Sequence, residues 1–375
     1  MSIDNGGQTA RLKIDSLQAL KTLAFLGIFL SHAKLSYMWY NLGVSVFFVL
    51  SGFLMTHVYD RRELTPSLKN NANFTIRKIK KLYPLHIITM LCFVVLNLIF
   101  AALYGGITLK SISYLLCKIG LNVTLLQSWI PNRFINTSLN SVAWYFSVML
   151  FLYFIFPWLH AFIKKTRKNI LYMIGMMLLI IQIVACFVFL RFIGRIDNVY
   201  VWFMYHSPVF RTGDFFIGCV LSRWYFEGDF SRINTLKATV YEIIAAIITI
   251  SVLIWSNKSH STTVSSAICN QTTIYIPLAA CWVFLFTLNK GLVSRSLTNK
   301  LVIYMGDICA YLFFINFVVT EYTNFAIKVF KWNVRIDNLM LVGIELGITV
   351  LLSIGYKFLI SVIMTTHNQE QAKTS

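Results

Sequence analysis

The feature that most constrains this chain is a series of long apolar runs without charge. The stretch ILYMIGMMLLIIQIVACFVFL, residues 170–190, contains no charged residue over 21 positions. A helix needs about 20 consecutive apolar residues to cross the hydrocarbon core of a bilayer. Of all 375 residues, 57% are hydrophobic and 13% are charged, whereas a soluble domain carries about 25% charge. We therefore expect an all-α polytopic membrane protein.

Ten segments are predicted to span the membrane: 17–35, 40–59, 82–104, 142–163, 170–190, 212–226, 239–255, 274–289, 301–327 and 339–365. The stretch 111–130 is interpreted as a half-inserted or surface helix, because an eleventh span would reverse the orientation of everything after it. The chain 1–375 is predicted to be one membrane-embedded domain with short polar tails at 1–16 and 366–375.

Basic residues set the expected orientation. With the N-terminus in the cytoplasm, the inside loops and tails hold 20 Lys and Arg, and the outside loops hold 11. This distribution follows the positive-inside rule. The richest inside segments are 60–81 and 163–169, whereas 328–338 is a local exception. An even number of spans then places the C-terminus in the cytoplasm as well.

Several functional classes are disfavoured by the sequence. The net charge of +19 does not indicate nucleic-acid binding, because the basic residues form short clusters between apolar runs. The seven cysteines include no CxxC pair, so we expect packing residues and neither a disulfide framework nor a metal site. No GxSxG, HExxH, Walker or GxGxxG motif is present, which disfavours serine-elbow hydrolases, zincins and nucleotide hydrolases.

Lys21 and His32 stand near the two ends of the apolar stretch LKTLAFLGIFLSHAK. Eleven residues make about 3.06 turns of α-helix, so both side chains point to nearly one face, roughly 16 Å apart along the axis. Lys21 then lies near the cytoplasmic end and His32 near the outer end, where a titratable base suits proton transfer. The alternative is that Lys21 snorkels to the headgroups and His32 bonds a neighbouring helix.

Two further stretches follow in the chain. In NLGVSVFFVLSGFLMTH (41–57), the small residues Ser51 and Gly52 allow two helices to approach closely. The stretch FTIRKIKKLYPLH (74–86) carries a basic cluster, which consists of Arg77, Lys78, Lys80 and Lys81. Such a cluster at the inner surface can bind anionic lipid or the phosphates of a nucleotide-like donor.

Together these stretches resemble the bacterial integral-membrane acyltransferase-3 family of glycan O-acetyltransferases. The resemblance rests on Leu-Lys-x-Leu-Ala with histidine eleven residues after the lysine, on FFVLSGF and on RKIKKLYP. Weaker matches follow in the family order: AWYFSVMLFLYFIFP (143–157), RTGDFFIG (211–218) and MGDICAYLFFIN (305–316). The chain departs from the family pattern at Lys21, Lys78 and Lys81 (usually arginine), Met149 (often glutamate) and Asn316 (often histidine).

The resemblance implies an O-acetyltransferase of the bacterial inner membrane. Acetyl-CoA would be the cytoplasmic co-substrate, with no permanently bound cofactor. The acceptor would be a hydroxyl of a surface polysaccharide or of its lipid-linked precursor. Lys21, Arg77, Lys78 and Lys81 would hold the CoA phosphates. His32 would be the catalytic residue, either as a general base or as a transient acyl acceptor.

Other polar residues have weaker assignments. Arg211 and Asp214 lie three apart at the outer start of a span, so they either pair structurally or bind the acceptor. Four acids in or near the apolar runs are functional candidates by default: Glu242, Asp307, Glu321 and Glu345. A rival function for the whole chain is a transporter or flippase of a glycan or lipid-linked sugar without acyl chemistry.

Overall fold

The structure is a computed structural model that describes residues 14–35, 39–106, 108–192, 197–258, 272–332, 334–335 and 338–374. Within these residues the chain is built from helices and contains no β-strand. The longer elements are α1 (Asp15–His32), α2 (Tyr40–Tyr59), α3 (Leu68–Ile79), α4 (Tyr83–Tyr104), α5 (Leu109–Val123), α7 (Ala143–Lys165), α8 (Lys168–Phe192), α10 (Pro208–Glu227), α11 (Thr235–Lys258), α13 (Tyr275–Leu288), α15 (Lys300–Asp307), α16 (Cys309–Val329) and α17 (Leu339–Thr374). Short elements connect them: η1 (Gln127–Trp129), α6 (Arg133–Asn136), α9 (Asp197–Val201), η2 (Trp202–His206), η4 (Thr272–Ile274) and α14 (Leu292–Ser296).

Every predicted span coincides with a helix or with a pair of helices. Six helices are long and apolar enough to cross a membrane: α2, α4, α7, α8, α11 and α17. A seventh candidate is α15 with α16, which cover the predicted span 301–327 but are bent by 75° at their junction. The helices α1, α10 and α13 coincide with predicted spans but do not meet the same requirement. The polytopic helical architecture is therefore observed, while the count of ten stays a prediction.

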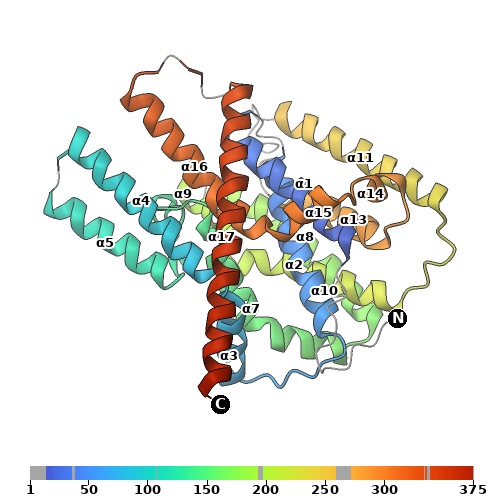
Figure 1. Cartoon of the computed structure of the whole chain (residues 1–375). Coiled ribbons are helices and arrows are strands. Elements are labelled where there is room, and N and C mark those ends of the chain that lie inside the picture. The colour runs from blue at the N-terminus through green and yellow to red at the C-terminus, as the bar shows by residue number, and fades with distance from the viewer. Residues whose placement is uncertain are drawn as a thin grey trace.

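The two ends of the bundle carry different connections. Figure 1 shows α3 and the C-terminus at the bottom, and the end of α16 and the beginning of α17 at the top. The predicted inside segment 60–81 and the described residues of the predicted outside segment 328–338 thus lie at opposite ends. The cytoplasmic location of the two termini stays a prediction. The helix α17 continues through most of the predicted tail 366–375, and residues 1–13 lie outside the described part.

The stretch 111–130 folds largely into α5, which returns along α4. A helix of 15 residues is about 22 Å long, shorter than the roughly 30 Å of a bilayer core. The end of α5 is fixed to the beginning of α4, because Tyr83 Oη lies 2.8 Å from the Val123 carbonyl and His86 Nε2 lies 2.9 Å from that of Asn122. The interpretation of 111–130 as a half-inserted or surface helix stays a prediction.

Two glycines bring α2 and α10 into backbone contact. A Cβ atom added at Gly52 would overlap the carbonyl oxygen of Phe215, and one at Gly218 would overlap the carbonyl oxygen of Val49. Backbone approach of this kind is what small residues permit between membrane helices. The predicted close approach is observed at Gly52, with α10 as the partner helix, whereas Ser51 does not face α10. Because α2 also packs against α1 and α13, it lies at the centre of the bundle.

Candidate active site

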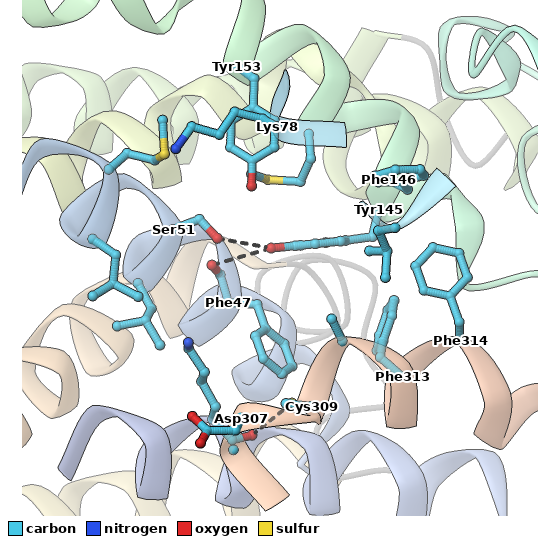
Figure 2. Close-up of a pocket in the computed structure, with 18 of the residues that line it drawn as sticks. Phe47, Ser51, Lys78, Tyr145, Phe146, Tyr153, Asp307, Cys309, Phe313 and Phe314 are labelled. Carbon is cyan, nitrogen blue, oxygen red and sulfur yellow. Dashed lines mark hydrogen bonds between the residues drawn. The ribbon is translucent and has the colours of Figure 1, made fainter. Parts of the chain in front are cut away.

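A cavity of about 360 Å³ lies between α1, α2, α3, α7, α15 and α16 (Figure 2). One face of α2 forms its longest wall, at the three- and four-residue spacing of a single helix face: Phe47, Leu50, Ser51, Leu54, Met55 and Val58. Eleven residues separate the first and last of these, so this wall is about 16 Å long. The sequence FFVLSGF therefore faces two ways, with Gly52 toward α10 and the lining residues toward the cavity.

Two of the predicted donor-binding lysines border this cavity. Lys21 reaches it from α1 and Lys78 from α3. The Nζ atom of Lys21 donates to Gln18 Oε1 at 3.2 Å, and Lys78 Nζ lies 4.6 Å from the ring centre of Tyr59. Figure 2 shows Lys78 on one side of the cavity and Asp307 on the other. Cationic groups from separate elements thus border one elongated space.

The other two predicted donor-binding residues lie elsewhere. Arg77 is exposed and borders a separate cavity of about 200 Å³, together with Glu63 and Asn70. Lys81 is exposed in the turn after α3, which ends at Ile79. The structure therefore divides the basic cluster, and within it Lys78 alone borders the main cavity.

His32 makes a defined hydrogen bond to Asn316. Its Nδ1 atom lies 2.7 Å from Asn316 Oδ1, while Asn316 Nδ2 donates to the carbonyls of Leu312 and Phe313 at 3.0 and 2.7 Å. An amide oxygen can only accept, so the proton of this bond belongs to Nδ1 of the histidine. In the neutral ring the lone pair is then on Nε2. Asn316 thereby fixes the tautomer that a base or nucleophile acting through Nε2 requires.

His32 lies just beyond the deep end of the cavity. Phe313 borders the cavity, and Asn316 follows it three residues later on α16, about 5 Å along the axis. The rings of Phe47, Tyr145 and Phe313, which we call the ring trio, line the cavity, and their centres lie between 5.6 and 6.2 Å from one another. The cavity therefore approaches His32 from the end of the bundle where α3 lies.

Arg211 and Asp214 form a buried ion pair. Both side chains are inaccessible to solvent, and their closest nitrogen and oxygen are 2.8 Å apart. Arg211 Nε also donates to the Tyr205 carbonyl at 2.8 Å, and Gln182 Nε2 donates to Asp214 at 3.3 Å. The guanidinium packs 5.0 Å from the ring centre of Phe48. This geometry favours the structural alternative, and acceptor binding by the pair stays a prediction.

The four acids named from the sequence lie in different parts of the structure. Glu242 is buried and accepts the backbone N–H groups of Val293 and Ser294 at 2.8 and 3.2 Å. It caps the start of α14, where a carboxylate is favourable. Glu345 is buried and accepts from Thr320 at 3.4 Å. Of the four, Asp307 is the acid that borders the main cavity.

A hydroxyl pair in the cavity was not anticipated from the sequence. Ser51 Oγ lies 3.1 Å from Tyr145 Oη, which also lies 3.4 Å from the Phe47 carbonyl. Sequence reasoning treated Ser51 as a packing residue and did not single out Tyr145. The signal that identifies Ser51 is its four-residue spacing from Phe47, which places both on the lining face of α2.

The described part of the chain contains neither a candidate metal site nor a disulfide bond. No cluster of three His, Cys, Asp or Glu side chains that could hold a metal ion is found there. The cysteines described in the structure are free thiols: Cys92, Cys117, Cys186, Cys219, Cys281 and Cys309. Cys269 lies outside the described residues.

Comparison with known proteins decides the family. The family model described as an acyltransferase domain (Acyl_transf_3) matches residues 14–358. The chain belongs to the acyltransferase-3 family. The resemblance inferred from Lys21, His32 and the two motifs is thus confirmed over nearly the whole chain.

One curated relative and the solved structures complete the comparison. The chain is 26% identical over 191 residues to the acyltransferase MdmB of Streptomyces mycarofaciens. This match covers 48% of the chain and 46% of the relative, so it spans about half of each protein. No solved structure matches the chain.

Proposed function

We propose that this protein transfers an acetyl group from cytoplasmic acetyl-CoA to a hydroxyl of a surface polysaccharide or of its lipid-linked precursor. The observation that carries the proposal is the elongated cavity that begins beside Lys78 and ends one helical turn from the His32–Asn316 pair. A donor held there has its phosphates at one end and its thioester near a histidine nitrogen at the other.

The donor half rests on the charge and shape of the cavity. Acetyl-CoA combines a phosphorylated nucleotide with a slender arm that ends in a thioester. Lysine ammonium groups bind phosphate oxygens through charge-assisted hydrogen bonds, and Lys21 and Lys78 both border the cavity. The long apolar wall of α2 fits a narrow, extended arm. Arg77 and Lys81 would contact the donor only where it extends outside the cavity.

The chemical step uses Nε2 of His32. As a general base, Nε2 takes the proton of the acceptor hydroxyl while the hydroxyl oxygen forms a bond to the thioester carbon. The carbon–sulfur bond then breaks, and the departing thiolate takes the proton back from the imidazolium. As a nucleophile, Nε2 instead forms a bond to the thioester carbon while the carbon–sulfur bond breaks, which gives an acyl-imidazolium and the CoA thiolate. In a second step the acceptor hydroxyl attacks the acyl carbon, the bond from this carbon to Nε2 breaks, and the thiolate takes the hydroxyl proton. In both routes Asn316 accepts a hydrogen bond from Nδ1–H, which keeps the proton on Nδ1, and the acyl group must reach His32 beyond the ring trio.

The experiment that tests this proposal follows the acetyl group. Detergent-purified protein is incubated with labelled acetyl-CoA and with surface glycan from cells that lack the gene. Transfer of label to the glycan is the expected result. If reconstituted vesicles move the glycan or its lipid-linked precursor across the bilayer while no label is transferred, the transporter alternative replaces the acetyltransferase.

A further inference from the structure

The Ser51–Tyr145 hydroxyl pair is a polar group set in an apolar wall. Figure 2 shows Tyr145 reaching across the cavity with its hydroxyl directed at Ser51, between Lys78 and Asp307. Its neighbours on the α2 face, Leu50 and Leu54, are aliphatic. Neither Ser51 nor Tyr145 is fully buried, because both border the open cavity. A hydrophobic ligand would gain nothing from such a pair, so its chemistry points to a ligand with polar groups partway along its length.

The hydrogen-bonding capacity of the pair is not exhausted by its internal bond. Two hydroxyls carry two protons and four lone pairs. One proton is used between Ser51 and Tyr145, and the other has only the 3.4 Å contact to the Phe47 carbonyl, which is long for an O–H donor. The pair can therefore present one proton and at least one lone pair to a ligand. An amide, with one C=O and one N–H, matches that combination.

We infer that Ser51 and Tyr145 form the binding site for an amide group of the donor's pantetheine arm, an inference that rests on the proposed function. The arm carries two amides between its phosphates and its thioester. Ser51 lies on the α2 wall between Val58 and Phe47, and Phe47 belongs to the ring trio. Tyr145 belongs to both the pair and the ring trio, so a ligand bound to the pair also lies against the ring trio.

The competing explanation is that the bond merely ties α2 to α7. An interhelical hydrogen bond of this kind contributes to stability in membrane proteins. It predicts that loss of either hydroxyl lowers the melting temperature and leaves ligand affinity unchanged. A ligand-binding role predicts weaker binding of any ligand that contains the arm.

The test compares two probes on full-length protein in detergent. Acetyl-CoA contains both the phosphates and the arm, whereas acetyl-pantetheine contains the arm alone. Binding of acetyl-CoA is measured directly, and acetyl-pantetheine is measured by its competition with labelled acetyl-CoA. The variants are Tyr145→Phe, Ser51→Ala and Lys78→Ala. The control is Ser45→Ala, which removes a buried serine of α2 that does not border the cavity.

The expected result is a difference in pattern between the variants. Tyr145→Phe and Ser51→Ala should lower the affinity for both probes by the same factor, about three- to tenfold. Lys78→Ala should lower the affinity for acetyl-CoA alone. Ser45→Ala should change the affinity for neither probe. Wild-type affinity for both probes in the two hydroxyl variants, with Lys78→Ala still selective, overturns the amide site and leaves the proposed function intact. Failure of the wild-type protein to bind acetyl-CoA overturns both.

Discussion

The side chain of Asn316 determines which ring nitrogen of His32 carries the proton. Asn316 is one of the positions where the sequence departs from the family pattern, and an amide side chain cannot act as an acid or a base. The Asn316 side chain makes two kinds of hydrogen bond. Its oxygen accepts from Nδ1–H of His32, and its nitrogen donates to a backbone carbonyl of its own helix. The residue thus acts through His32 and positions it.

Asn316→Ala should separate positioning from binding. Without its acceptor, His32 can rotate and can place its proton on either nitrogen, so kcat should fall about tenfold to a hundredfold. The KM for acetyl-CoA should change little, because Asn316 does not border the cavity. The matched control is Asn97→Ala, which removes an amide bonded only to its own helix. Steady-state kinetics check this, and an Asn316→Ala variant with unchanged kcat would remove the positioning role.

The basic cluster also gives different predictions for different residues. Lys78→Ala should weaken acetyl-CoA binding about tenfold or more, which corresponds to roughly 1.4 kcal/mol, because Lys78 borders the cavity. Lys81→Ala should have a smaller effect, since Lys81 is exposed in a turn. Lys69→Ala, at an exposed position on α3, is the control. Calorimetry on purified protein measures all three, and equal affinities would reduce the cluster to a topology signal.

At the scale of helices, the crossing of α2 and α10 depends on the absence of two side chains. Gly218→Ala places a Cβ against the Val49 carbonyl oxygen, and backbone cannot yield as a flexible side chain can. We expect a destabilisation of about 1–3 kcal/mol, seen as a lower melting temperature in detergent. Gly175→Ala on α8 is the control, since a Cβ there meets nothing within 4 Å. Equal melting temperatures for the two variants would contradict the close crossing.

The elements themselves were largely predictable from the sequence, because long apolar runs determine where a helix can cross a bilayer. The break between α15 and α16 was not, since 301–327 was predicted as one continuous span. At the break, Gly306 packs against the Gln18 carbonyl of α1, where a Cβ would not fit, and this contact lies far away in the sequence. The cavity was equally hidden, because its walls come from six helices and no local pattern joins Ser51 to Tyr145. His32 was predicted because a titratable group in an apolar stretch is itself a signal, and Lys78 because it belongs to a basic cluster beside a span.

At the scale of the whole molecule, the direction of acetyl transfer depends on which end of the bundle faces the cytoplasm. Cysteines introduced singly at Lys69 and Lys331, in a cysteine-free background, report the two ends seen in Figure 1. An impermeant reagent should label position 331 and not position 69 in intact cells, because the positive-inside rule places the 60–81 segment in the cytoplasm. Labelling at position 69 from outside would reverse the donor and acceptor sides.

The central claim is that His32 performs the transfer while a separate cavity holds the donor. The most direct measurement compares wild-type and His32→Ala protein, purified at matched levels, for acetyl-CoA affinity and for transfer of labelled acetyl to glycan. His32 lies beyond the cavity and does not line it, so affinity should be retained while transfer is lost. Transfer at the wild-type rate by His32→Ala would contradict the account.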